Sequence, residues 1–151
     1  MRPLATAASA LAIALLAASG SRAESCKAID TSIETTFSLT ECQSPVGVCT
    51  TGNVESGKLE GTTRFTALTM VPGAQPDTVL YTGLLTIDTK SGSVTLRDYG
   101  ILNSATGEYF EIQQVVDGNR SYKRATGILT SRGWATSTGF AGNLVGTICN
   151  K

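Results

Sequence analysis

The stretch Asp117-Gly-Asn-Arg-Ser-Tyr-Lys-Arg-Ala-Thr-Gly127 joins two segments in which apolar and polar residues alternate. Aspartate, glycine and asparagine favour tight turns, and an alternation with a period of two is typical of β-strands. The stretch contains no set of nucleophile, base and acid, so it informs the fold rather than the chemistry. It predicts a turn that connects two antiparallel strands.

The same alternation continues on both sides of this turn. After the first 23 residues, no segment repeats its apolar residues every three or four positions, and glycine, threonine and serine recur throughout. This composition predicts an almost entirely β protein. The predicted strands are residues 58–70, 81–88, 93–100, 108–116, 125–134 and 140–148.

Several strands of this length joined by short turns form either a closed antiparallel barrel or a sandwich. Four glycines within strands favour the barrel, because a small barrel needs bends to close its sheet. These glycines are Gly61, Gly83, Gly142 and Gly146. We therefore predict an all-β fold, a small closed antiparallel barrel stabilised by disulfides.

The alternation also predicts which side chains face the barrel interior. In the hairpin 81–100 the inward row contains Tyr81, Leu85, Leu96 and one carboxylate, Asp98. In residues 108–116 the more apolar row is predicted to face inward, which places Glu111 in water. That row consists of Phe110, Ile112, Gln114 and Val116.

The first 23 residues resemble a secretory signal peptide, with an apolar centre and small residues before position 24. Its apolar part is shorter than the roughly 20 residues of a membrane span. We predict a leader (1–23), an N-terminal arm carrying cysteines (24–48) and a barrel domain (49–151). The predicted location is secreted, either extracellular or periplasmic.

Four cysteines in an exported small domain predict disulfide bonds. The favoured pairing joins Cys42 to Cys49 and Cys26 to Cys149, and the main competing pairing joins Cys49 to Cys149. The sequence contains no histidine, and the cysteines lack the paired short spacings of a zinc site, so no metal site is predicted. No glycine loop opens a helix, so no cofactor is implied.

Charge and composition narrow the range of partners. The chain has 12 basic and 12 acidic residues, without the positive excess that nucleic acids or anionic membranes attract. No nucleic-acid partner is therefore predicted, and no membrane span is predicted because no apolar stretch is long enough. The absence of histidine also excludes Ser-His-Asp and Cys-His catalysis.

Residues 115–127 resemble the glycine-rich turn and strand start of allene oxide cyclase-like barrel proteins, a calycin-type family related to the dirigent proteins. Thr106-Gly-Glu-Tyr-Phe110 and Phe140-Ala-Gly-Asn-Leu-Val-Gly146 are similar to the family's flanking strands. The resemblance covers about residues 49–149 and implies a barrel whose interior binds reactive hydrophobic molecules. It allows a homo-oligomer, although the predicted faces leave no contiguous apolar stripe outside. No catalytic residue transfers from the family.

The remaining candidates come from the residues themselves. Asp98, on an apolar face, is predicted to act as an acid or base beside Tyr81, or else to cap the turn at Gly100. Glu111 becomes a ligand-binding candidate if its strand faces the other way. Arg132 and Trp134 share one face and are predicted to line the barrel mouth and bind an anionic or aromatic ligand there, or else Trp134 serves only for packing.

Two functions follow from these predictions. The first is an exported barrel that binds a small apolar molecule and steers its cyclisation or isomerisation without a cofactor. The second is a non-enzymatic extracellular protein that binds a protein or glycan through its outer face or loops. A hollow interior favours the first function, and a filled interior favours the second.

Overall fold

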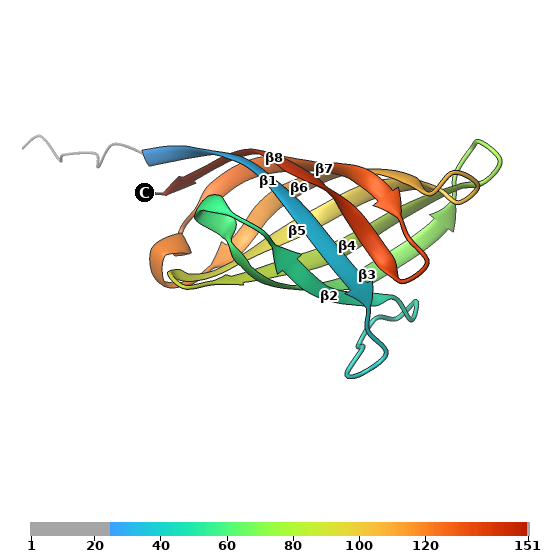
Figure 1. Cartoon of the computed structure of the whole chain (residues 1–151), viewed down its shortest axis with the longest axis horizontal. Coiled ribbons are helices and arrows are strands. Elements are labelled where there is room, and N and C mark those ends of the chain that lie inside the picture. The colour runs from blue at the N-terminus through green and yellow to red at the C-terminus, as the bar shows by residue number, and fades with distance from the viewer. Residues whose placement is uncertain (1–24, 151) are drawn as a thin grey trace, which may run out of the picture.

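The computed structural model describes residues 25–150, and the predicted leader (1–23) lies outside them. Eight strands form a closed antiparallel barrel in which each strand pairs with its neighbour in the chain and β8 pairs with β1 (Figure 1). The all-β barrel and its closure are therefore confirmed. The strands are β1 (Ser25–Phe37), β2 (Cys49–Val54), β3 (Gly61–Pro72), β4 (Thr78–Thr89), β5 (Gly92–Asn103), β6 (Glu108–Gly118), β7 (Thr126–Ala135) and β8 (Gly139–Asn150).

The predicted N-terminal arm does not lie outside the barrel. Residues 25–37 form β1, which pairs with β2 on one side and with β8 along twelve register positions on the other. The boundary predicted at residue 49 therefore falls inside the barrel. The alternating apolar side chains of this strand, Ile29 and Ile33, are both buried in the core.

The strands alternate in direction, so their connections gather at two ends of the barrel. One end, which we call the mouth, carries the segments 38–48, 73–77, 104–107 and 136–138. The other, the closed end, carries two short 3-10 helices, η1 (Gly57–Leu59) and η2 (Arg120–Tyr122). Figure 1 shows the barrel from the side, with the closed end at the left and β8 ending there.

Two side chains plug the closed end. Leu59 from η1 and Tyr122 from η2 are both completely buried. The Tyr122 hydroxyl donates a 2.6 Å hydrogen bond to the Lys58 carbonyl oxygen, which ties the two helices together. The turn within residues 117–127 thus closes the barrel as well as connecting β6 to β7. The core around the plug consists of Ile29, Val54, Ile87, Val94, Leu96, Leu129, Leu144 and Ile148.

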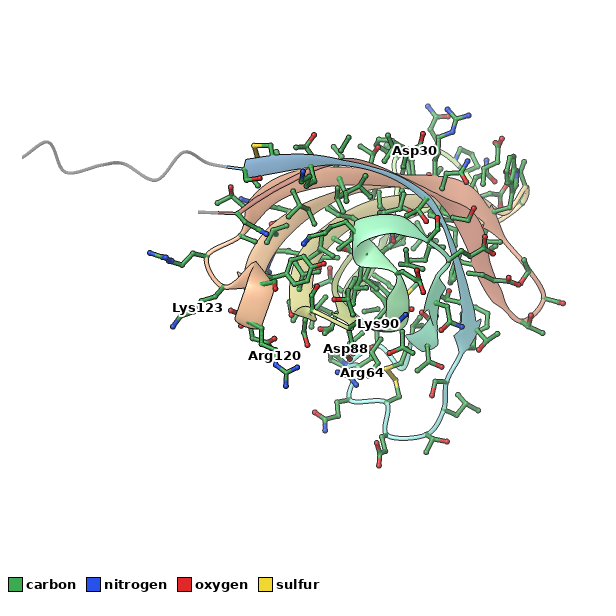
Figure 2. The ribbon with its side chains drawn as sticks, turned by 60° about the vertical axis from the view of Figure 1, so that its left-hand side comes forward. Asp30, Arg64, Asp88, Lys90, Arg120 and Lys123 are labelled. Atoms are coloured by element: carbon green, nitrogen blue, oxygen red, sulfur yellow. A yellow bond between two sulfur atoms is a disulfide. The ribbon has the colours of Figure 1, made fainter. Side chains whose placement is uncertain are left out.

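Charged side chains surround the closed end on its outside. Arg64 of β3 forms a 2.9 Å ion pair with Asp88 of β4, and Figure 2 shows the two side by side. Arg120 and Lys123, on the turn that carries Tyr122, extend away from the barrel in the same view. The buried plug is therefore surrounded by charged side chains at the surface.

The two disulfides confirm the favoured pairing. Cys26 lies directly opposite Cys149 in the β1–β8 ladder, and their bond joins positions separated by 123 residues. Cys42 and Cys49, separated by seven residues, close the connection between β1 and β2 at the mouth. Two disulfides are typical of proteins that fold in an oxidising compartment.

The predicted orientation of β6 is wrong. Tyr109, Gln113 and Val115 face the interior and are buried. The more apolar row lies outside, where 42% of Phe110 and 48% of Ile112 are exposed. At this level the interior already holds Asp98, and a polar side chain from β6 can hydrogen-bond to it, whereas an apolar one cannot.

Candidate functional site

A cavity of about 60 Å³ occupies the mouth half of the barrel, above the packed core. Its two sides differ in chemistry. Apolar and aromatic side chains from β1, β3 and β8, including Ile33, Phe65 and Phe140, line one side. Polar side chains from β4 to β7 line the other: Tyr81, Asp98, Tyr109, Glu111, Gln113 and Ser131.

Two carboxyl groups meet in this cavity. Asp98 of β5 lies opposite Gln113 of β6 in the ladder, and Glu111 precedes Gln113 by two positions on the same face. The Gln113 amide nitrogen donates one hydrogen bond to Asp98 Oδ2, at 3.1 Å, and another to Glu111 Oε2, at 3.0 Å. One amide group therefore bridges the two acids.

Tyr81 of β4 completes the cluster. Its hydroxyl donates a 2.8 Å hydrogen bond to Glu111 Oε1. Its ring crosses over Gly100, the cross-strand partner of Tyr81, and a Cβ atom at Gly100 would overlap that ring. The absence of a side chain at Gly100 therefore leaves space for the Tyr81 ring. From this position Tyr81 holds the Glu111 carboxyl in place through its hydrogen bond.

Asp98 lies in the middle of β5 and its side chain points into the cavity, so it does not cap a turn at Gly100. The structure brings Asp98, Tyr81 and Glu111 together, as the inward-facing alternative for Glu111 predicted. Gln113, Tyr109 and Ser131 were not among the predicted site residues. The Tyr109 hydroxyl lies 3.1 Å from the Ser131 hydroxyl across the β6–β7 ladder.

Two oxygen atoms of the cluster retain hydrogen-bonding capacity. Asp98 Oδ1 and Gln113 Oε1 are buried and have no hydrogen-bond partner among the described residues. Buried polar atoms in native proteins almost always have a partner, so each exception needs an explanation, such as a catalytic role or a bound molecule. A ligand that carried a polar group could pair with these atoms.

The environment raises the pKa of both carboxyl groups. Burial raises the pKa of Asp98 well above its usual range, the neighbouring Glu111 raises it further, and the hydrogen bond from Gln113 opposes this. Burial also raises the pKa of Glu111, from 4.5 to about 7, against the opposing hydrogen bonds from Tyr81 and Gln113. Burial therefore favours the protonated form of Asp98, and Glu111 can exchange a proton near neutral pH.

The tyrosines beside the acids are held in the neutral form. Burial, followed by the Glu111 charge, raises the pKa of Tyr81. Burial raises the pKa of Tyr109 to about 12, although its hydrogen bond to Ser131 opposes the shift. Both hydroxyl groups can therefore donate hydrogen bonds throughout the physiological pH range.

The Glu111 pKa predicts that stability falls as pH rises. A folded-state pKa above the unfolded value adds stability that is complete below pH 4.5 and is lost as pH passes through about 7. The shift corresponds to a loss of up to about 3 kcal/mol. We expect urea unfolding of the wild type to show this loss between pH 4.5 and 8.5, and Glu111→Gln to reduce it.

Glu108→Gln changes an exposed residue on the same strand, so its free energy of unfolding should depend on pH as in the wild type. Asp98, Tyr81 and Tyr109 are the other titratable groups that act on Glu111 or share its cavity. If Glu111→Gln showed the same dependence of unfolding free energy on pH as the wild type, the Glu111 carboxyl would not titrate in the predicted range.

Arg132 and Trp134 do not line the cavity. Both project from the outer face of β7, where 59% of Trp134 is exposed, because inward positions on this strand belong to Leu129 and Ser131. They border a shallow concavity on the outer wall together with Phe110 and Glu108. Their predicted position lining the mouth is therefore wrong, whereas ligand binding by these two residues stays a prediction.

Within residues 25–150, no group of three or more His, Cys, Asp or Glu side chains is placed to hold a metal ion. The same residues include no helix of the length and apolarity needed to cross a membrane. Comparisons of the chain with protein-family models, curated proteins and solved structures found no match.

Proposed function

We propose that the protein binds a small, largely apolar molecule in the barrel cavity and isomerises or cyclises it by proton transfer. The observation that carries this proposal is the pair of carboxyl groups, Asp98 and Glu111, bridged by Gln113 inside an apolar cavity. Pairs of acids whose environments separate their pKa values commonly divide the roles of acid and base. The resemblance of residues 115–127 to allene oxide cyclase-like barrels agrees with a ligand in the interior.

The cavity residues have separate roles in the proposed reaction. Ionised Glu111 accepts a proton from a carbon atom of the substrate, while protonated Asp98 donates a hydrogen bond to the oxygen on which negative charge develops. Return of the proton to a different carbon gives an isomer, so no other reactant is needed. Tyr81 positions Glu111 through its 2.8 Å hydrogen bond.

The volume of the cavity also limits the size of the ligand. A volume of about 60 Å³ is far below the roughly 300 Å³ of the smallest drug-sized pockets. The protein would therefore enclose a small molecule or the reactive end of a longer one that extends through the mouth. Confinement between Phe65, Phe140 and the acids would fix that end in one orientation.

We further propose that the protein acts outside the cytoplasm, secreted into the extracellular space or the periplasm. Both disulfides are consistent with this location, since thiols in the cytosol are kept reduced. The apolar segment within residues 1–23, which lie outside the described residues, would direct export.

Native mass spectrometry of the exported protein, followed by organic extraction, tests the function. We expect a stoichiometric apolar passenger in the wild type and in Glu111→Gln. On incubation with that molecule in D₂O, the wild type should form an isomer that carries solvent deuterium. Glu111→Gln should do so at least about 100-fold more slowly, as expected for loss of a general base.

Glu108→Gln serves as the matched control and should retain full activity, since this carboxylate lies outside the cavity. Equal rates in Glu111→Gln and the wild type would remove Glu111 from the reaction. A wild type that carries no passenger and gains no thermal stability from a panel of apolar ligands would overturn the cavity as a binding site.

One observation favours the second candidate function, contact with a glycan through the outer face. Trp134 presents an exposed ring beside the polar groups of Asn103, Glu108 and Arg132 around the shallow concavity. An aromatic face with hydrogen-bonding groups at its edge can hold a polar ligand in one orientation. An empty cavity together with glycan binding that Trp134→Ala abolishes would establish this function instead.

A further inference from the structure

The outer wall of the barrel carries a contiguous apolar patch. It extends over β3 to β6 in two adjacent rows on the half nearer the mouth. Between 40 and 51% of each residue in it is exposed. We define the outer patch as Val71, Leu80, Tyr99, Ile101, Phe110 and Ile112.

The strand register makes these residues direct neighbours. Val71 pairs with Leu80, Leu80 with Ile101, and Ile101 with Phe110, so one row crosses four strands without interruption. Tyr99 pairs with Ile112 in the next row. The reversed orientation of β6 produces this patch, because it places two large apolar side chains outside.

The patch is large enough for a protein interface. At these exposed fractions its residues present roughly 600 Å² together, the upper end of what monomeric proteins expose in one patch. A standard interface takes about 800 Å² from each partner, and somewhat more than half of that area is apolar. The patch therefore supplies the apolar content of one complete interface.

The distribution of charge around the patch also fits a protein interface. None of its six members is an acidic or basic residue, so two copies placed face to face would bring no like charges together. Arg97 and Arg132 lie at its margins, beside Tyr99 and Phe110 respectively. A charge-free centre with a charged rim is the usual anatomy of an interface.

We propose that the outer patch binds the outer patch of a second copy of this chain, forming a two-fold symmetric dimer. The closed barrel leaves no unpaired strand edge, so two copies associate through wall surfaces instead of by extending a sheet. In a two-fold dimer each residue of the patch is buried twice, once in each copy. This proposal is independent of the ligand in the cavity.

Sedimentation equilibrium of the exported protein between 1 and 100 µM tests the dimer. We expect the wild type to be dimeric and Ile112→Lys to weaken the dimer at least 100-fold, because both copies then bring a charge into the apolar interface. Ile128→Lys makes the same change on β7, where 61% of the residue is exposed outside the patch, and should leave the dimer intact.

Three results would overturn the proposal. The first is a wild type that remains monomeric at 100 µM. The second is equal dissociation in the two lysine variants, which would place the interface elsewhere. The third is a monomer that co-sediments with phosphatidylcholine vesicles through Ile112, which would assign the patch to a lipid surface.

Discussion

Removal of the Cys26–Cys149 disulfide, as Cys26→Ser with Cys149→Ser, is expected to destabilise the protein by about 4 to 5 kcal/mol. The bond closes a loop between positions separated by 123 residues, and the chain-entropy cost of unfolding a cross-linked chain grows with loop length. Urea unfolding under oxidising conditions, with the free energy extrapolated to zero urea, measures the loss.

The second disulfide provides a matched control. Cys42 and Cys49 are separated by only seven residues, so Cys42→Ser with Cys49→Ser should cost about 2 to 3 kcal/mol by the same relation. Both variants are expected to retain the barrel, because the β1–β8 ladder is held by backbone hydrogen bonds as well. Equal losses in the two variants would show that loop length does not govern the effect.

Replacement of the plug residue, Tyr122→Ala, is expected to cost about 3 to 5 kcal/mol. The ring is completely buried at the closed end, and the Lys58 ammonium lies 5.3 Å from its centre. Truncation therefore leaves a cavity beneath η1 and η2 and also releases Lys58. The temperature midpoint and the urea midpoint of unfolding both report this change.

Tyr122→Phe separates packing from hydrogen bonding at this position. It retains the ring and removes the hydroxyl that donates to the Lys58 carbonyl oxygen at 2.6 Å, so a loss of about 1 kcal/mol is expected. A loss in Tyr122→Phe as large as that in Tyr122→Ala would assign the stabilisation to the hydrogen bond instead of to the buried ring.

The alternation of apolar and polar residues was sufficient to predict the barrel, because in most strands the side chains on one face are clearly more apolar than those on the other. The hairpin 81–100 shows this: Leu85 and Leu96 face inward, as predicted, and Asp98 faces inward with them. The favoured disulfide pairing was also correct. Cys42 and Cys49 are close in the chain, and the tie expected between the N-terminal segment and the last strand is the β1–β8 ladder, in which Cys26 lies opposite Cys149.

Strand β6 shows where the same reasoning fails. Its two rows both contain apolar and polar residues, and the row with more apolar residues lies outside. The correct orientation depends on Asp98 of the neighbouring strand, which Gln113 satisfies with a hydrogen bond. A pattern within one strand cannot reveal a partner on another, so Glu111 was placed in water and the outer patch was missed.

Tyr122 illustrates a second limit of prediction from the sequence. The turn around it was recognised, but a tyrosine between charged residues gives no sequence signal that it is buried. Its burial depends on η1, which lies more than sixty positions away in the chain. The same holds for Gly100, whose role is set by the ring of Tyr81.

The pairing of β8 with β1 also determines the order in which the protein can fold. Each of the other seven ladders joins strands that follow one another in the chain, so each can form as a local hairpin. The β1–β8 ladder must bring together the two ends of the domain, and contacts between distant positions form slowly because the chain must first lose entropy. We therefore expect closure of this ladder to limit the folding rate, because before it closes the paired strands would form an open sheet with two unpaired edges.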